Sequence, residues 1–232
     1  MREIQDQDKL DLHRRKFQLD EVFSEASLKK MKLFKVEKGE VLCSKGDRLS
    51  HMYFLTEGKM KIFALSPEGK ALILRFKTPF AIIGDVEYVQ DTEVFHTVQF
   101  VTEGYMIGIP LDDLRKIEGG NTTFLNFLLE IITAKFYTET NASTLNMLYS
   151  VDVRLASYLL SLSDDGKGSM FHEEMHTSSL QELADVLGTS YRHLNRILRQ
   201  FHEDGILERK RGLISVKDMD RLREKADGNI YE

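Results

Sequence analysis

Residues 179–201 read SLQELADVLGTSYRHLNRILRQF. The segment opens with a capping box, in which the Ser179 hydroxyl and the Glu182 carboxylate would satisfy free N–H groups at a helix start. Apolar residues then recur at helical spacing up to Gly188, which can take the left-handed turn that ends a helix. Thr189 or Ser190 can cap a second helix with the same spacing. These signals predict a helix-turn-helix. The expected buried faces are Leu180, Leu183, Ala184 and Leu187 in the first helix, and Leu194, Ile197, Leu198 and Phe201 in the second.

The outward face of the second helix is cationic, and no Asp or Glu occurs between Thr189 and Phe201. Arg and Asn side chains pair with guanine and adenine edges in the major groove, and a face without acids can approach phosphates unopposed. The segment therefore predicts DNA binding. We expect four residues to read bases: Tyr191, Arg192, Asn195 and Arg196. We expect six to contact phosphates: Ser179, Thr189, Ser190, Arg199, Lys210 and Arg211.

A short hairpin is predicted directly after these helices. Ile206-Leu207 and residues 213–216 are apolar strands, and between them lies the basic turn Glu208 to Gly212. Such a hairpin is a wing, whose cations would contact phosphates without reading sequence. Residues 189–216 hold six Arg and Lys against three acids, although the whole chain has a net charge of −5. The basic patch is local.

Length and composition limit the class of protein. A chain of 232 residues predicts one or two domains, and 42% apolar with 30% charged residues is typical of an ordered globular protein. The chain has no stretch of about twenty apolar residues, so we expect no segment that spans a bilayer. Residues 1–16 lack the apolar centre of a secretory signal. The single cysteine, Cys43, excludes an internal disulfide framework and a four-cysteine iron–sulfur or zinc site from one chain. We expect a cytoplasmic protein without membrane contact.

The first half of the chain has a different pattern of apolar and turn residues. Between residues 33 and 110, short apolar runs alternate with glycines and turn residues at spacings too close for helices. Ser66-Pro67-Glu68-Gly69 has the form of a hairpin turn. This pattern predicts several short antiparallel strands in a barrel or sandwich.

A long helix of some 25 residues is predicted from Asn121 or Thr122, either of which can cap it. It carries two apolar stripes, so two arrangements are open. The helix either packs wholly inside its own chain, or one stripe faces the barrel and the other a partner helix. We assign five residues to a dimer helix: Phe124, Leu128, Ile131, Ala142 and Leu145. The neighbouring stripe is Leu125, Leu129, Ile132 and Phe136.

Through these helices and the wing, the sequence resembles the CRP/FNR family of transcription regulators, and Ser190-Tyr191-Arg192-His193-Leu194 is similar to its YeiL-like branch in particular. The likeness rests on residues 180–190 followed by Arg196-Ile197-Leu198, and on Asp204-Gly205-Ile206-Leu207 at the wing. Upstream, motifs such as Lys38-Gly39-Glu40 and Ile83-Gly84-Asp85 occur in the family's order. The resemblance implies an α+β fold with a β-roll sensor (residues 1–118, with an N-terminal helical segment), a long dimerisation helix (119–149) and a winged helix-turn-helix (150–232). It also implies a homodimer on a palindromic operator, contact with RNA polymerase, and a small-molecule effector of unknown identity. The implied effector pocket is Ile83, Gly84, Asp85, His96 and Thr97.

Departures from the family pattern argue against several classes of effector and cofactor. Cyclic-nucleotide binders hold the phosphate with an Arg before the strand that here contains Val98, but no Arg occurs between Arg75 and Arg115. This argues against cAMP or cGMP sensing. The lone Cys43 argues against an iron–sulfur cluster, and we expect it to be a core residue. His51 and His96 are isolated, which argues against haem or a bound metal.

The resemblance also bears on the DNA sequence. Members that read a TGTGA half-site carry a Glu where this chain has Arg192, and an Arg where it has Tyr191. Because Arg prefers the acceptor pair of guanine whereas Glu accepts from cytosine, we expect a different half-site.

Two other readings compete. His172-Glu173-Glu174-Met175-His176 fits the H-E-x-x-H zinc-hydrolase motif, with His172 and His176 as ligands and Glu173 activating water. It lies between a loop sequence and a helix cap, which leaves about one turn of helix, too short for such a site. A cyclic-nucleotide-sensing regulatory module is disfavoured by the missing Arg and by the wing. No other catalytic pattern stands out, so we expect no enzyme activity.

Overall fold

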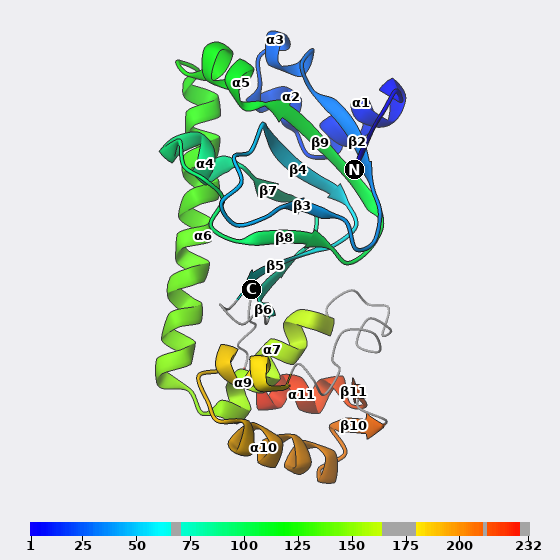
Figure 1. The fold of residues 1–232 in the computed structure, drawn as a ribbon, viewed down its shortest axis with the longest axis vertical. Helices are drawn as coiled ribbons and strands as arrows, with labels where there is room; N and C mark the ends of the chain where they lie inside the picture. The colour runs from blue at the N-terminus through cyan, green and yellow to red at the C-terminus, as the bar shows by residue number, and fades with distance from the viewer. Residues whose placement is uncertain (66–70, 164–179, 211–212, 228–232) are drawn as a thin grey trace. The chain divides into compact units, whose positions relative to one another are not determined.

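The structure is a computed structural model that describes residues 1–65, 71–163, 180–210 and 213–227. It divides into two compact units (Figure 1). Unit 1 is Met1–Ala64 with Leu74–Phe136, and unit 2 is Leu65–Ile73 with Tyr137–Glu232. The division falls inside the long helix α6 (Thr122–Leu148). Among the residues that the structure describes, none of the helices has an apolar stretch that could span a lipid bilayer.

The strands β1 to β9 form two sheets, which lie in unit 1 except for Leu65 of β5 and residues 71–73 of β6. The five-stranded sheet has the order β1-β2-β9-β4-β7, and the four-stranded sheet has the order β3-β8-β5-β6. The six pairs β1–β2, β2–β9, β9–β4, β4–β7, β3–β8 and β8–β5 are antiparallel, as the spacing of turns predicts. The strands are β1 (Arg2–Ile4), β2 (Lys32–Val36), β3 (Val41–Cys43), β4 (His51–Glu57), β5 (Met60–Leu65), β6 (Ala71–Lys77), β7 (Ala81–Ile83), β8 (Thr97–Phe100) and β9 (Gly104–Pro110).

The middle of β4 is a continuous apolar run rather than an alternating one, because the strand is buried on both faces. Tyr53 and Leu55 point into a core shared with the second sheet, whereas Met52 and Phe54 point into a core covered by helices. Successive side chains of a strand alternate between faces, so a strand buried on both faces must be apolar throughout. The five-stranded sheet is therefore a middle layer between the other sheet and the helices.

The helices of unit 1 cover the outer face of this middle layer (Figure 1). They contribute Leu10, Leu19, Leu114 and Phe124 to the core there, together with Phe23 between two of them. The helices are α1 (Gln7–Lys16), α2 (Leu19–Val22), α3 (Glu25–Leu28), α4 (Asp85–Gln90), α5 (Leu111–Glu118) and the first part of α6.

The start of α6 is held by Asn121, as the sequence predicts. Its Oδ1 accepts hydrogen bonds from the N–H groups of Thr123 (3.0 Å) and Phe124 (3.4 Å). The buried carboxylate of Glu118 accepts from the Asn121 side chain at 2.5 Å, and from the N–H and hydroxyl of Ser24 at 2.9 and 2.6 Å. Ser24 is the N-cap residue of α3. One carboxylate thus joins the beginnings of two helices.

Unit 2 contains a winged helix-turn-helix, confirming the α+β class. Its helices and strands surround one apolar core that includes Leu155, Leu159, Leu187 and Ile214. The elements are α7 (Val151–Ser163), α9 (Leu180–Val186), α10 (Tyr191–Glu203), β10 (Leu207–Lys210), β11 (Leu213–Val216) and α11 (Met219–Lys225).

Candidate nucleic-acid interface

The turn between α9 and α10 has the predicted chemistry. Gly188 adopts a φ of +57°, and the N–H of Thr189 donates to the Ala184 carbonyl at 2.8 Å, which is the bond of a Schellman motif. Of the two proposed caps, Ser190 is the one used, because its Oγ accepts from the His193 N–H at 3.2 Å. The glycine and the cap together fix where α10 begins.

The apolar faces of the two helices point inward. All eight residues predicted as the buried faces of α9 and α10 are buried in the unit 2 core. The rotation of α10 about its axis is therefore set by packing. The opposite face of α10 must then point to solvent.

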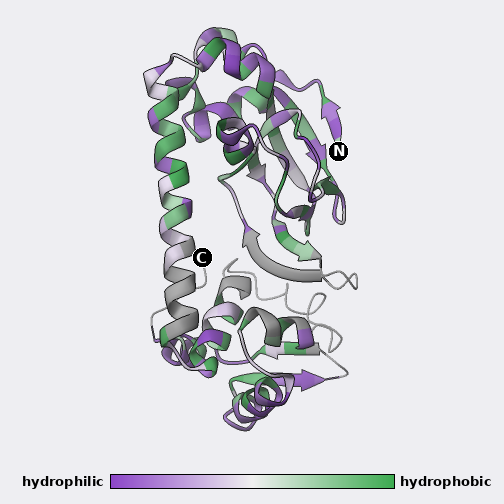
Figure 2. Cartoon of the chain, turned by 60° about the vertical axis from the view of Figure 1, so that its left-hand side comes forward, coloured by the Kyte–Doolittle hydropathy of each residue, from purple (hydrophilic) through white to green (hydrophobic). Residues whose placement is uncertain are grey.

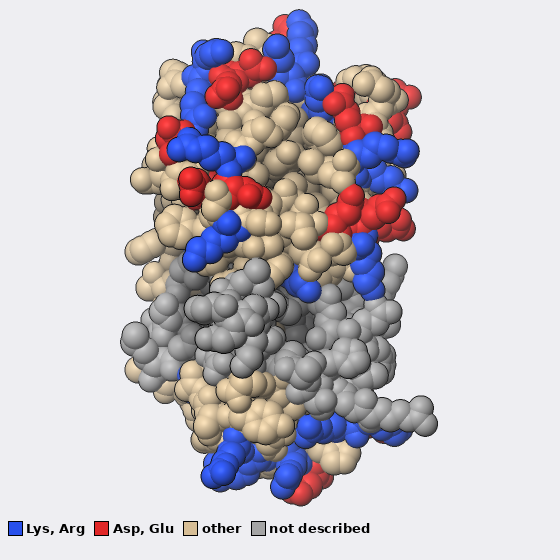
Figure 3. Space-filling model, viewed as in Figure 1, with Lys and Arg blue, Asp and Glu red and all other residues tan. Residues whose placement is uncertain are grey.

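That outward face carries the cations. Arg192, Arg196 and Arg199 are exposed, and Tyr191 keeps 41% of its surface accessible. Figure 3 shows Lys and Arg side chains gathered over α10 and β10. Arg196 Nη2 lies 3.1 Å from His193 Nε2, and an imidazole nitrogen that carries no proton can accept a hydrogen bond from the guanidinium. The guanidinium groups face outward, as the predicted role requires.

Asn195 differs from its arginine neighbours because it is half-buried and bonded on both ends of its amide. Its Oδ1 accepts from Arg209 Nη1 at 3.1 Å, and its Nδ2 donates to the Tyr191 carbonyl at 3.2 Å. Arg209 belongs to β10, so this bond joins the wing to α10.

The wing is confirmed, with one correction to its turn. Strand β10 pairs with β11 through Lys210, so Glu208, Arg209 and Lys210 are strand residues rather than the predicted turn. Strand alternation then separates them: Arg209 shares the face of buried Leu207, whereas Glu208 and Lys210 share the other. The sequence predicts one basic turn here, in which Arg209 would contact phosphate as the other two cations do. The two-residue spacing of Leu207 and Arg209, which places both side chains on one face of a strand, is the signal that could have revealed the inward position of Arg209.

On the outer face of the wing, Glu208 is held between two lysines. Its carboxylate lies 2.7 Å from Lys210 Nζ and 2.9 Å from Lys217 Nζ. Hydrogen bonds from Lys210 and then Lys217 lower the pKa of Glu208 to about 2. Lys210 is exposed, but part of its charge is offset by this carboxylate. Two other predicted phosphate contacts, Ser179 and Arg211, lie outside the described residues, as do His172, Glu173 and His176.

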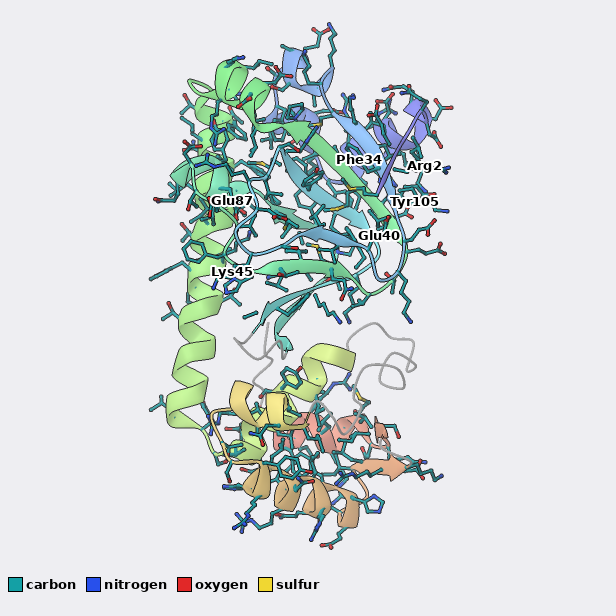
Figure 4. The ribbon with its side chains drawn as sticks, viewed as in Figure 1. Arg2, Phe34, Glu40, Lys45, Glu87 and Tyr105 are labelled. Atoms are coloured by element: carbon teal, nitrogen blue, oxygen red, sulfur yellow. The ribbon has the colours of Figure 1, made fainter. Side chains whose placement is uncertain are left out.

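The residues of the implied effector pocket lie in unit 1. Ile83 is in the core between the sheets, and Gly84 (φ +102°) begins α4. The buried carboxylate of Asp85 pairs with Lys135 of α6 at 2.8 Å, and the same ammonium donates to the Ile82 carbonyl at 2.9 Å. Figure 4 shows Glu87 at α4, beside α6.

The other two pocket residues have different neighbours. The buried Thr97 accepts a hydrogen bond at Oγ1 from the Lys45 N–H (3.2 Å), and His96 is exposed. Where cyclic-nucleotide binders of the family carry an Arg, Val94 is buried and Phe95 is 62% exposed.

Cys43 is buried in β3 as expected, and burial raises the pKa of its thiol to about 12. His51 is half-buried, with its ring 5.6 Å from that of Tyr53 and 6.0 Å from that of Phe34. Among the described residues, no group of His, Cys, Asp and Glu is placed to hold a metal ion.

The two stripes of α6 differ in burial, and this corrects the assignment of the dimer helix. Phe124 and Leu128 are 0% and 2% exposed and belong to the core of unit 1, where Ile131 also packs. Side chains buried in their own chain cannot form a seam with a partner. The neighbouring stripe is the accessible one, with Leu125 and Leu129 at 43% and 63% exposure. Figure 2 shows hydrophobic residues recurring along the part of α6 that belongs to unit 1. The side chains of Ala142 and Leu145 lie outside the description.

Two family models match the chain. Residues 33–118 match the cyclic nucleotide-binding domain, and residues 153–225 match the Crp-like helix-turn-helix domain. The first covers most of unit 1 and the second covers α7 to α11.

Whole proteins are similar to this chain over most of its length. The regulatory protein YeiL of Escherichia coli O157:H7 is 28% identical over 191 residues, which is 82% of this chain and 84% of YeiL. The anaerobic regulatory protein of Aggregatibacter actinomycetemcomitans is 22% identical, over 84% of this chain and 76% of that protein. A crystal structure of a CRP/FNR family regulator from Eubacterium rectale gives a TM-score of 0.73 at 19% identity, covering 90% of this chain and 97% of that one. These relatives are regulators, and they give no support to a zinc hydrolase.

Proposed function

Because this chain belongs to the CRP/FNR family of transcriptional regulators, we propose that it acts in the cytoplasm as a homodimer on a palindromic operator, under the control of a signal received by the β-roll. The observation that carries the DNA-binding part is the outer face of α10, which is exposed, cationic and free of acids from Tyr191 to Phe201. A helix with this face fits the major groove, where its position next to phosphates is favourable.

The side chains divide into two roles by their place on this surface. Arg192 and Arg196, with Tyr191 and Asn195, lie on α10 where a recognition helix meets base edges. Contacts to phosphate would come from the residue before α9, the turn, the C-terminal half of α10 and the wing. These are Ser179, Thr189, Ser190, Arg199, Lys210 and Arg211. Since Arg192 offers donors where a Glu would offer acceptors, we expect a half-site other than TGTGA.

Dimerisation would use the accessible stripe of α6. Leu125 and Leu129 expose apolar surface on a helix whose neighbouring stripe is already buried. A twofold axis along such a helix places each stripe against its own copy. On a palindromic operator, the two recognition helices of such a dimer would read half-sites about one DNA turn, roughly 34 Å, apart.

The signal would act on α6 through the Asp85–Lys135 pair. This pair joins the start of α4 to the long helix, and the second Asp85 oxygen, Oδ2, is buried without a hydrogen bond from the described residues. An effector that donates a hydrogen bond there would compete for the carboxylate and alter its hold on α6. RNA polymerase would be the partner of the DNA-bound dimer.

The test is selection of binding sites from random DNA by the full chain, followed by two substitutions. Arg192→Ala should weaken the selected operator by about 5- to 150-fold and relax the preference at one base pair. Lys210→Ala should weaken all sequences alike and flatten the dependence of affinity on salt. A palindromic selected site supports the proposal. Failure to enrich any sequence, or equal loss on operator and random DNA for Arg192→Ala, would refute it.

A further inference from the structure

Arg209 occupies an inward position in a strand that otherwise presents charge to solvent. It faces Ile214 across the hairpin, and Ile214 is 1% exposed. Directly opposite residues of an antiparallel pair lie on the same face, so the Arg209 side chain lies on the inner side of the wing. The bond from its Nη1 to Asn195 Oδ1 agrees with this position.

This bond decides which way the Asn195 amide points. As it lies, Oδ1 meets a donor on Arg209 and Nδ2 meets an acceptor, the Tyr191 carbonyl. A flip of the amide would set an N–H against the guanidinium and an oxygen against the carbonyl, and both hydrogen bonds would be lost. The guanidinium and the helix carbonyl therefore lock one of the two orientations.

The locked amide keeps half of its hydrogen-bonding capacity. A carboxamide oxygen can accept two hydrogen bonds and its nitrogen can donate two. One of each is used within the protein, so one acceptor site and one N–H remain. Adenine presents one donor and one acceptor, N6–H and N7, in the major groove, and it is the base that Asn reads with this pair of groups.

We propose that Arg209 is a positioning residue that holds Asn195 ready to read adenine, so that a residue of the wing sets the base preference of the recognition helix. The inference rests on the proposed DNA-binding function. Arg209 touches no base in this arrangement and acts through Asn195. A bond that merely fastened the wing to α10 would change affinity for all sequences and leave the preference at one base pair intact.

The experiment compares full-length variants on the operator selected by the wild-type chain. Fluorescence anisotropy gives the Kd for the operator and for duplexes in which each A·T pair of one half-site is changed to G·C. Wild type should show one A·T pair whose change costs about 5- to 150-fold. Asn195→Ala should reduce that discrimination to about 3-fold or less, and it thereby identifies the pair.

Arg209→Met is the decisive variant, because methionine keeps an apolar stem for packing on the wing. It should lose discrimination at the same pair, and Asn195→Ala added to it should cause no further loss there. Lys210→Ala is the matched control, since it removes one charge from the same strand on the opposite face. It should weaken every duplex and keep the discrimination.

The outcomes separate the two proposals. Selective loss in Arg209→Met with retention in Lys210→Ala supports the positioning role. If Arg209→Met behaves as Lys210→Ala does, or if Asn195→Ala leaves the discrimination at every A·T pair unchanged, this inference is wrong although the protein still binds DNA. If wild type enriches no sequence, the proposed function itself has failed.

Discussion

Replacing Leu129 by alanine tests which stripe of α6 meets a partner. Full burial of a leucine contributes about 1.5–3 kcal/mol. Leu129 is 63% exposed, so covering it in a dimer would contribute about 1–2 kcal/mol per copy, or about 2–4 kcal/mol for two symmetric copies. Since alanine loses most of this, Leu129→Ala should raise the dimer Kd by about 10- to 150-fold.

Leu128, the adjacent residue, supplies the control. It is 2% exposed and lies in the core of unit 1, so Leu128→Ala should lower the free energy of unfolding of each protomer by about 2–5 kcal/mol. Sedimentation equilibrium over a dilution series would give the dimer Kd, and urea denaturation at a concentration where the chain is monomeric would give protomer stability. Dimerisation unchanged in Leu129→Ala would show that the exposed stripe is not the seam, and the reasoning would fail.

Three further changes follow from contacts in the two units. Lys135→Met leaves the Asp85 carboxylate buried without its cation. Because Lys135 is one-third exposed, the free energy of unfolding should fall by about 1–3 kcal/mol rather than by the 3–5 kcal/mol typical of buried pairs. Urea denaturation would measure this loss, and adding Asp85→Asn should recover part of it. Wild-type stability in the single variant would contradict this. Glu208 remains charged at neutral pH because its pKa is about 2. Glu208→Gln should therefore tighten binding to random DNA and steepen the slope of log K against log salt by up to about one, which anisotropy at a series of salt concentrations would measure. A shallower slope would count against the wing as a phosphate contact. With a pKa of about 12, roughly 1 in 10,000 Cys43 thiols is ionised at pH 8. The folded protein should therefore react slowly with an aromatic disulfide reagent that labels the urea-unfolded chain at once. Rapid labelling of the folded chain would contradict this and would favour a redox-sensing role for Cys43.

The features that the sequence predicts well are those set by near neighbours in the chain. The spacing of apolar residues locates α9 and α10, and Gly188 and Ser190 locate the turn and the cap, because each of these signals acts within one or two helical turns. The same holds for Asn121 at the start of α6.

The features that the sequence misses depend on distant partners. Both stripes of α6 are apolar, and only packing against residues such as Phe23 and Tyr88 determines which one is buried. The bond between Asp85 and Lys135 spans 50 residues, and that between Asn195 and Arg209 joins a helix to a strand. Charge alone marks Arg209 as one more cation of the wing, whereas the pairing of β10 with β11 turns it inward.

Glu118 joins parts of the chain that are almost a hundred residues apart. Because its carboxylate accepts from both Ser24 and Asn121, the short helix before the first core strand and the first turn of α6 share one anchor. Neither end can fray alone without leaving a buried charge poorly solvated. The opening of the long helix at this end is therefore cooperative with the detachment of residues 24–28, so that local unfolding there would release both segments together.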